Sequence, residues 1–251
     1  MDVGERRRVT ARASDSGAAY TGAAMAHSST PTPAAEKQSA APRHVRALIL
    51  AGGESRRMGE PKALLRWHEE SLLARAARVA REATGWPVAI SLPHAAGCSG
   101  ALLRAARRLA PPRLRVHDAA LDCGPVAGVL AAFEALDDDW ILWLAVDMPW
   151  CDAAVLLHLL DRMPPDARAT VATYRGRVQP ACALLHRAAV PLARHAVAQR
   201  RGLIWLLEAA GAAVVAVPRR AGSSPFASID TPTTWRTHLR KLSRPAPTAK
   251  S

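Results

Sequence analysis

The feature that most constrains this chain is an apolar run, Val45–Leu50, that leads directly into a loop of glycines and cations. Glycines let backbone N–H groups approach phosphate oxygens, and cationic side chains neutralise the phosphate charge. The loop is not a Walker A loop, because no Gly-Lys-Ser/Thr follows the glycines, and it is not a G-x-G-x-x-G dinucleotide fingerprint. A buried strand that enters such a loop predicts a phosphate-binding site. The loop contains Gly52, Gly53, Gly59, Arg56, Arg57 and Lys62.

Composition makes Lys62 the most informative of these cations. The chain has 34 basic residues, and the only lysines among them are Lys37, Lys62, Lys241 and Lys250. Lys62 is therefore the only lysine of the expected ordered region before its C-terminal end. An ammonium is a compact point charge suited to a phosphate, and arginine does not replace it freely. We expect Lys62 to bind a phosphate rather than to lie on a solvated loop.

The segments of the chain alternate between the patterns of strands and those of helices. Such alternation predicts a mostly parallel sheet, and strands that are apolar throughout predict helices on both faces. We therefore predict an α/β protein with three layers. The expected strands are 45–50, 88–92, 114–118, 140–146, 169–174, 180–185 and 212–217, and the expected helices are 71–84, 100–109, 125–136, 152–163, 188–199, 202–210 and 231–242.

Carboxylates follow two of the expected strands, where a sheet of this kind binds its ligands. Asp118 ends one strand and Asp147 ends another. Carboxylates beside a phosphate loop indicate Mg²⁺, which prefers oxygen ligands and keeps substrate phosphates in its coordination shell. A helix cap or a turn residue is the alternative reading of both. Gly124 and Gly128 allow helix capping and close packing on the sheet, which is compatible with lining the site.

The ends of the chain differ in composition from its centre. Residues 1–43 are rich in Ala, Ser, Thr, Gly and Pro without apolar periodicity, which predicts a disordered N-terminal extension. Met25 is an alternative to Met1 as the start of translation. We expect one domain at 44–242 and a basic disordered tail at 243–251.

The net charge of +13 invites a nucleic-acid interpretation, but no zinc-finger spacing, basic heptad or RNA-binding aromatic signature accompanies it. We expect no nucleic-acid partner. The four cysteines show no C-x-x-C pair and fit reduced thiols, and no apolar run reaches the length of a membrane span. We therefore expect a cytoplasmic protein without a membrane partner. The sequence does not indicate an oligomeric state.

Four blocks of the chain together resemble the molybdenum cofactor guanylyltransferases. The first block alone is shared across many nucleotidyltransferases, and the second and last make the match more specific. Gln179-Pro180 is similar to a further block of the family. The four blocks are Leu50–Leu65, Asp118 with Gly124-Pro125-Val126-Ala127-Gly128, Leu144-Ala145-Val146-Asp147-Met148-Pro149, and Phe226-Ala227-Ser228-Ile229-Asp230-Thr231-Pro232.

The resemblance implies a Rossmann-like nucleotidyltransferase fold and a Mg²⁺-dependent enzyme. Its reaction transfers GMP from GTP to the phosphate of molybdenum-molybdopterin, giving the guanine dinucleotide cofactor and pyrophosphate. Molybdenum-insertion proteins and apo-molybdoenzymes are the further partners that it implies, without identifying the recipient. By resemblance, Leu50, Ala51, Gly52 and Gly53 contact the nucleotide, Lys62 and Arg56 neutralise phosphates, Asp147 holds the metal, Asp118 binds the nucleoside, and Ser91 and Gly124 line the nucleotide site.

Some residues depart from the family pattern and leave the base specificity open between GTP and CTP. Ser91 stands where the family has an asparagine, and Asp230 replaces an asparagine in the closing block. Only Glu60 and Pro61 separate the last glycine of the loop from Lys62, which is similar to the related cytidylyltransferases. A cytidylyltransferase or another nucleotidyltransferase of the same fold is therefore one alternative. A non-catalytic protein that binds a cofactor or a nucleic acid is the other.

Overall fold

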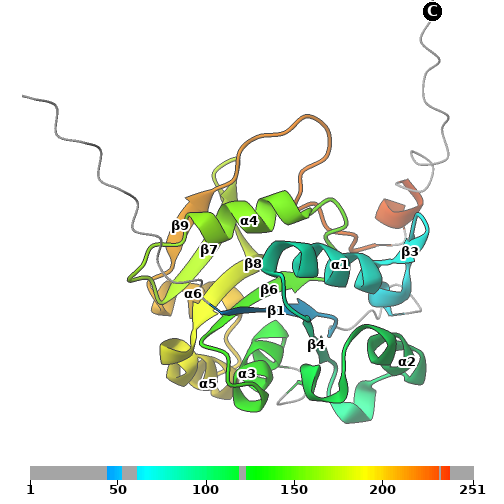
Figure 1. Ribbon diagram of the computed structural model, residues 1–251, viewed down its shortest axis with the longest axis horizontal. Helices are drawn as coiled ribbons and strands as arrows, with labels where there is room; N and C mark the ends of the chain where they lie inside the picture. Colours follow the sequence, from blue (N-terminus) through cyan, green and yellow to red (C-terminus); the bar gives the residue numbers. More distant parts are fainter. Residues whose placement is uncertain (1–43, 53–60, 119–122, 232, 238–251) are drawn as a thin grey trace, which may run out of the picture. The chain divides into compact units, whose positions relative to one another are not determined.

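The computed structural model describes residues 44–52, 61–118, 123–231 and 233–237. These residues form an α/β structure around a seven-stranded sheet of order β5-β4-β1-β6-β8-β7-β9 (Figure 1). The predicted fold class is confirmed. The strands of this sheet are β1 (Val45–Leu50), β4 (Ala89–Leu92), β5 (Arg115–His117), β6 (Trp140–Ala145), β7 (Ala169–Tyr174), β8 (Arg177–His186) and β9 (Ala213–Ala216), and a separate hairpin is formed by β2 (Arg66–Trp67) and β3 (Glu70–Ser71).

The sheet is parallel except at β8, which runs antiparallel to both of its neighbours, β6 and β7. A tight turn at Arg175 and Gly176 joins β7 to β8, and both turn residues have positive φ angles, of 51° and 76°. Such a short connection can join only antiparallel strands. β8 begins earlier than the predicted 180, because its first residues pair with β7 while remaining partly exposed and so lack an apolar pattern.

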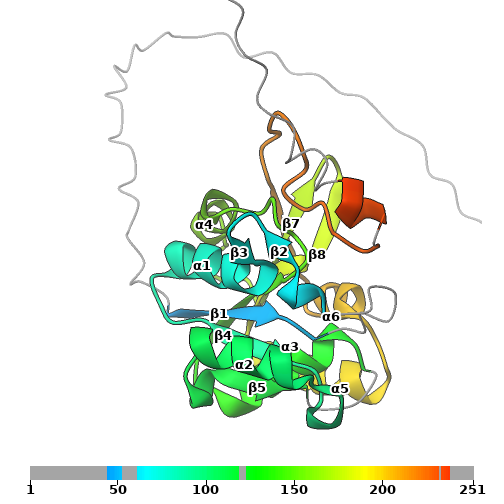
Figure 2. The same ribbon diagram turned by 90° about the vertical axis from the view of Figure 1, so that its right-hand side faces the viewer.

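The helices form two groups, one on each face of the sheet (Figures 1 and 2). Helix α1 contacts α2 and α4 on one face, and α3 contacts α5 and α6 on the other. The three predicted layers are therefore present. The α-helices are α1 (Leu72–Thr84), α2 (Gly100–Leu109), α3 (Pro125–Ala135), α4 (Ala153–Asp161), α5 (Val190–Ala198) and α6 (Leu203–Ala209), and the short 3-10 helices are η1 (Lys62–Leu64), η2 (Ala95–Gly97), η3 (Pro112–Leu114) and η4 (Arg187–Ala189).

Local capping explains why the helix starts were predictable. The Ser71 side chain accepts a hydrogen bond from the Ala74 N–H at 3.1 Å and so begins α1, and Gly85 ends α1 with a φ of 73°. Ser99 and Asp152 cap α2 and α4 in the same way. Of the closing helix predicted for 231–242, residues 233–237 are helical. Residues 1–43 and 238–251 lie outside the described residues, so the predictions for both ends stay predictions.

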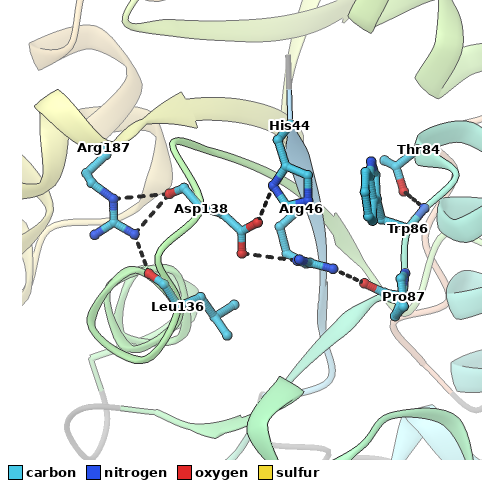
Figure 3. A network of polar contacts seen from close by, with 8 residues as sticks. All are labelled: His44, Arg46, Thr84, Trp86, Pro87, Leu136, Asp138 and Arg187. Atoms are coloured by element: carbon cyan, nitrogen blue, oxygen red, sulfur yellow. Dashed lines mark hydrogen bonds and ion pairs between the residues drawn. The ribbon is translucent and has the colours of Figure 1, made fainter. Parts of the chain in front are cut away.

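A buried carboxylate ties the amino-terminal edge of the sheet together (Figure 3). Asp138, which is 7% exposed, accepts contacts from His44 Nδ1 at 2.7 Å and from Arg46 Nε at 3.1 Å. Arg46 also donates to the Pro87 carbonyl at 2.8 Å, and Arg187 donates to the carbonyls of Asp138 and Leu136. The network joins the starts of β1 and β6 to the connections before β4 and after β8. It lies at the opposite edge from the carboxylates that follow the strands.

We predict that Asp138→Ala destabilises the fold by about 1.5–3 kcal/mol, because it leaves the largely buried Arg46 guanidinium without its carboxylate. Thermal unfolding monitored by circular dichroism measures the effect. Asp139→Ala is the matched control, because the neighbouring Asp139 is exposed. Equal melting temperatures for the two variants would contradict a structural role for the Asp138 network.

Candidate active site

The carboxyl end of β1 lies between β4 and β6. Leu50 pairs with Ser91 of β4 on one side and with Ala145 of β6 on the other. Two further backbone hydrogen bonds continue this alignment beyond the strand, from Ala51 N–H to the Ser91 carbonyl at 3.0 Å and from Val146 N–H to the Leu50 carbonyl at 3.2 Å. The backbone of the predicted phosphate loop therefore starts between the polar groups of β4 and those that follow β6.

On the β4 side, Ser91 and Asp118 form a polar pair against two glycines. The Ser91 hydroxyl, in a residue only 1% exposed, donates to Asp118 Oδ1 at 2.6 Å. A Cβ added at Gly128 would lie 2.1 Å from Ser91 Oγ, and one added at Gly52 would lie 2.7 Å from Asp118 Oδ2. Any side chain at either glycine would displace the pair. The pair requires these glycines for space rather than for an unusual backbone conformation.

The environment of Asp118 leaves it capable of binding a ligand. Burial raises the pKa of Asp118, while the hydrogen bond from Ser91 and the nearby His117 and His94 oppose that rise. Ser91 contacts only Oδ1 in the described structure, and Oδ2 faces the Gly52 backbone. A carboxylate in this position can accept hydrogen bonds from hydroxyl or N–H groups of a nucleoside.

On the β6 side, Lys62 lies between two carboxylates. Its Nζ is 3.3 Å from Asp147 Oδ2 and 2.8 Å from Asp230 Oδ1. The side chains of Lys62 and Asp147 are about 20% exposed, whereas that of Asp230 is 58% exposed. Lys62 begins η1, Asp147 follows β6, and Asp230 belongs to the segment after Phe226, so three distant parts of the sequence meet at this point.

The pKa values of the two carboxylates in this cluster, Asp147 and Asp230, are shifted in opposite directions. Burial and the charge of Asp230 raise the pKa of Asp147, although Lys62 opposes the rise. Burial also acts on Asp230, but hydrogen bonds from Lys62 and Ser228 outweigh it and lower the pKa of Asp230. Burial disfavours the charge of Lys62, yet its hydrogen bond to Asp230 and the charge of Asp147 raise its pKa overall. Lys62 is therefore an ammonium at neutral pH.

Helix α3 begins next to the site. Its N-cap, Gly124, has a φ of 65° and a ψ of −166°, a conformation that side chains rarely adopt, and Pro125 follows as the first helical residue. The unpaired N–H groups and the positive end of the helix dipole favour an anion at such a start. Gly128 lies one turn further along and contacts Ser91. Gly124 therefore caps the helix and Gly128 packs against Ser91, and both positions are compatible with lining the site.

The structure brings most of the predicted site residues together at one edge of the sheet. Leu50, Ala51 and Gly52 lie between the Ser91–Asp118 pair and Asp147, and Lys62 contacts Asp147. Gly53 and Arg56 lie outside the described residues. Sequence reasoning did not include Asp230 and Gly128 among the site residues. Both belong to blocks that the sequence analysis singled out, and Asp230 is the one position of the closing block where an acid replaces an amide.

Comparison with known proteins identifies the class to which this fold and site belong. A family model described as a MobA-like NTP transferase domain matches residues 47–214, so the chain belongs to that family of nucleotidyltransferase domains. A molybdenum cofactor guanylyltransferase from Pseudomonas entomophila is 36% identical over 59% of this chain and 74% of its own length. A relative from Opitutus terrae, named a probable molybdenum cofactor guanylyltransferase, is 44% identical over 42% of this chain, and the match spans 49% of that relative.

Solved structures share the fold. Molybdopterin-guanine dinucleotide biosynthesis protein A from Archaeoglobus fulgidus superposes with a TM-score of 0.60 at 19% identity, covering 79% of this chain and 98% of that one. A cytidylyltransferase from Leptospira borgpetersenii also superposes with a TM-score of 0.60, at 15% identity, covering 83% of this chain and 90% of that one. Because proteins named for different nucleotides fit equally well, the fold by itself does not distinguish the base. Within the described residues, no helix has the length and apolar character needed to cross a membrane.

We predict that Gly128→Ala destabilises the protein by about 1–3 kcal/mol, because the new methyl group collides with the buried Ser91–Asp118 pair. Such a loss lowers the melting temperature by roughly 2–4 °C for each kcal/mol in a domain of this size. Gly97→Ala is the control, since a Cβ there meets nothing within 4 Å. A melting temperature of Gly128→Ala equal to that of the control would show that the pair does not need the space.

Proposed function

We propose that this protein transfers GMP from GTP to the terminal phosphate of molybdenum-molybdopterin, releasing pyrophosphate. One observation carries the proposal: Lys62 and Asp147 meet beside the backbone of Leu50–Gly52 in a chain of the MobA-like family. That arrangement offers an ammonium to the phosphates and a carboxylate to a cation that the phosphates bind, beside the backbone at which the phosphate loop begins. The names of the relatives from Pseudomonas entomophila and Opitutus terrae support the choice of acceptor and nucleotide.

In this reaction an oxygen of the pterin phosphate forms a bond to the α-phosphorus of GTP. The bond between that phosphorus and the bridging oxygen breaks, and pyrophosphate leaves with the electron pair. The protein contributes orientation and charge neutralisation rather than a covalent intermediate. Lys62 neutralises phosphate oxygens, the backbone of Leu50, Ala51 and Gly52 contacts the nucleotide, and Asp118 with Ser91 holds the nucleoside.

The residues at the end of β6 fit a divalent cation such as Mg²⁺. Asp147 offers carboxylate oxygens, and the described residues contain no group of three or more His, Cys, Asp or Glu that could hold a metal by themselves. Mg²⁺ ordinarily takes one or two carboxylates and completes its shell with water and substrate phosphates. When bound, the cation would stabilise the charge that develops on the phosphate oxygens.

We predict that Asp147→Ala lowers turnover by about 10²–10³-fold, the scale for removing a main electrostatic element of an active site. The fold should survive, because Asp147 follows a strand instead of packing in the core. Asp137→Ala is the control, since exposed Asp137 precedes the same strand at its other end. Steady-state rates with GTP, Mg²⁺ and the pterin acceptor measure the effect. An unchanged rate in folded Asp147→Ala would contradict the assignment of Asp147 as the ligand of the metal.

The nucleotide preference tests the guanylyl assignment. We predict a higher kcat/KM for GTP than for CTP or ATP with one pterin acceptor, and mass spectrometry of the product identifies the transferred nucleotide. A site that hydrogen-bonds one base edge rejects another because buried polar groups are left unpaired. Ser91 in place of an amide is the observation that favours a cytidylyltransferase as the second candidate. A clear CTP preference would assign that activity, and binding of nucleotide without transfer to the pterin would overturn both.

A further inference from the structure

Asp230 makes the shortest contact to Lys62. Asp230 Oδ1 lies 2.8 Å from the ammonium, and Asp147 Oδ2 lies 3.3 Å from the same atom. The ammonium is thus placed between two carboxylates that come from segments far apart in the chain. A positive charge between two carboxylates is the arrangement that a bound divalent cation would also produce.

The backbone holds the two acidic segments together independently of these side chains. The Ile229 N–H donates to the Asp147 carbonyl at 3.0 Å, so the residues on either side of this bond are fixed against each other. The Ser228 hydroxyl donates to Asp230 Oδ2 and orients that carboxylate. Further along the same segment, the Trp235 ring lies 6.3 Å from the ring of buried Trp67. Asp230 therefore has a defined position although its side chain is largely exposed.

The charges of this cluster do not suit a triphosphate in the absence of a cation. When ionised, Lys62, Asp147 and Asp230 together carry a net charge of −1. An anionic nucleotide is repelled by the carboxylates, and the carboxylates compete with its phosphates for the ammonium of Lys62. A divalent cation between Asp147 and Asp230 would reverse the sign of the cluster and release the ammonium. An asparagine at position 230 would instead leave the cluster neutral and Lys62 more weakly held.

We propose that Asp230 is a second carboxylate of the cation site, and that Lys62 occupies this site until the cation displaces it toward the nucleotide phosphates. The proposal rests on the proposed function, because it assigns a further residue to the same phosphate-transfer site. It predicts opposite effects of one substitution. Asp230→Asn weakens binding of the cation, and it strengthens binding of GTP in the absence of any cation.

The competing role for Asp230 is to position Lys62 for the phosphates without contacting a cation. In that case Asp230→Asn would leave cation affinity unchanged and would weaken GTP binding, because Lys62 would lose its orientation. The two roles therefore predict opposite changes in cation-free GTP binding for Asp230→Asn, and only the cation-site role predicts a change in cation affinity. Neither measurement requires the pterin or turnover.

The test uses the full chain without the pterin, and the cation arm uses Mn²⁺, without nucleotide, as a paramagnetic substitute for Mg²⁺. Electron paramagnetic resonance of free Mn²⁺ gives the cation affinity, and equilibrium dialysis of GTP in EDTA gives the cation-free nucleotide affinity. We expect Asp230→Asn to weaken Mn²⁺ binding about tenfold or more, and to strengthen cation-free GTP binding several-fold, as loss of a charge-assisted contact predicts. Asp137→Asn, which removes an exposed carboxylate at the other end of β6, should change neither value.

Asp230→Glu keeps the carboxylate and should recover part of the Mn²⁺ affinity. Absence of Mn²⁺ binding to the unsubstituted chain, or equal Mn²⁺ affinity in the chain and Asp230→Asn, would overturn the proposal. Weaker cation-free GTP binding in Asp230→Asn would also overturn it, in favour of the positioning role. Failure of GMP transfer to the pterin with the Mn²⁺ result intact would instead overturn only the proposed function.

Discussion

Two backbone hydrogen bonds beyond the end of β1 determine where the polar groups of the site lie. Ala51 donates to the Ser91 carbonyl, and Val146 donates to the Leu50 carbonyl, so the carboxyl ends of β4, β1 and β6 remain aligned. Parallel strands end at one edge of a sheet, and this alignment brings the residues that follow them into one place. The Ser91–Asp118 pair and the Lys62–Asp147–Asp230 cluster lie on the two sides of that central strand.

In the proposed function, the two groups serve different parts of the nucleotide because their environments differ. Ser91 and Asp118 are packed against Gly52 and Gly128, where only glycine leaves room, so they form a closely fitted polar surface suited to a nucleoside. Lys62 and its carboxylates carry the charge of the site, and Asp230 remains largely exposed. Charge at an accessible position can exchange partners when phosphates and a cation arrive. The proposal therefore separates recognition of the nucleoside from charge neutralisation by the width of one strand.

Sequence patterns predicted the site residues that lie next to strands. An apolar strand leading into a glycine loop indicated Gly52 and Lys62, and acids directly after strands indicated Asp118 and Asp147. The family resemblance added Leu50, Ala51 and Ser91. Asp230 was not predicted as a site residue, because no strand precedes it and it lies 168 residues from the lysine that it contacts. The sequence assigned Gly128 to helix capping and close packing on the sheet, which is compatible with lining the site, and the structure adds its close approach to Ser91.

The sequence by itself determined the class of fold and the starts of α1 and α2. Local rules suffice for these features, because hydrophobic periodicity and Ser caps act over a few residues. Only the tertiary structure decided the reversed direction of β8 between β6 and β7, the closeness of Ser91 to Gly128, and the sharing of Lys62 by two carboxylates. These features depend on contacts between segments far apart in the chain. Local patterns of residues do not specify which distant segments come into contact.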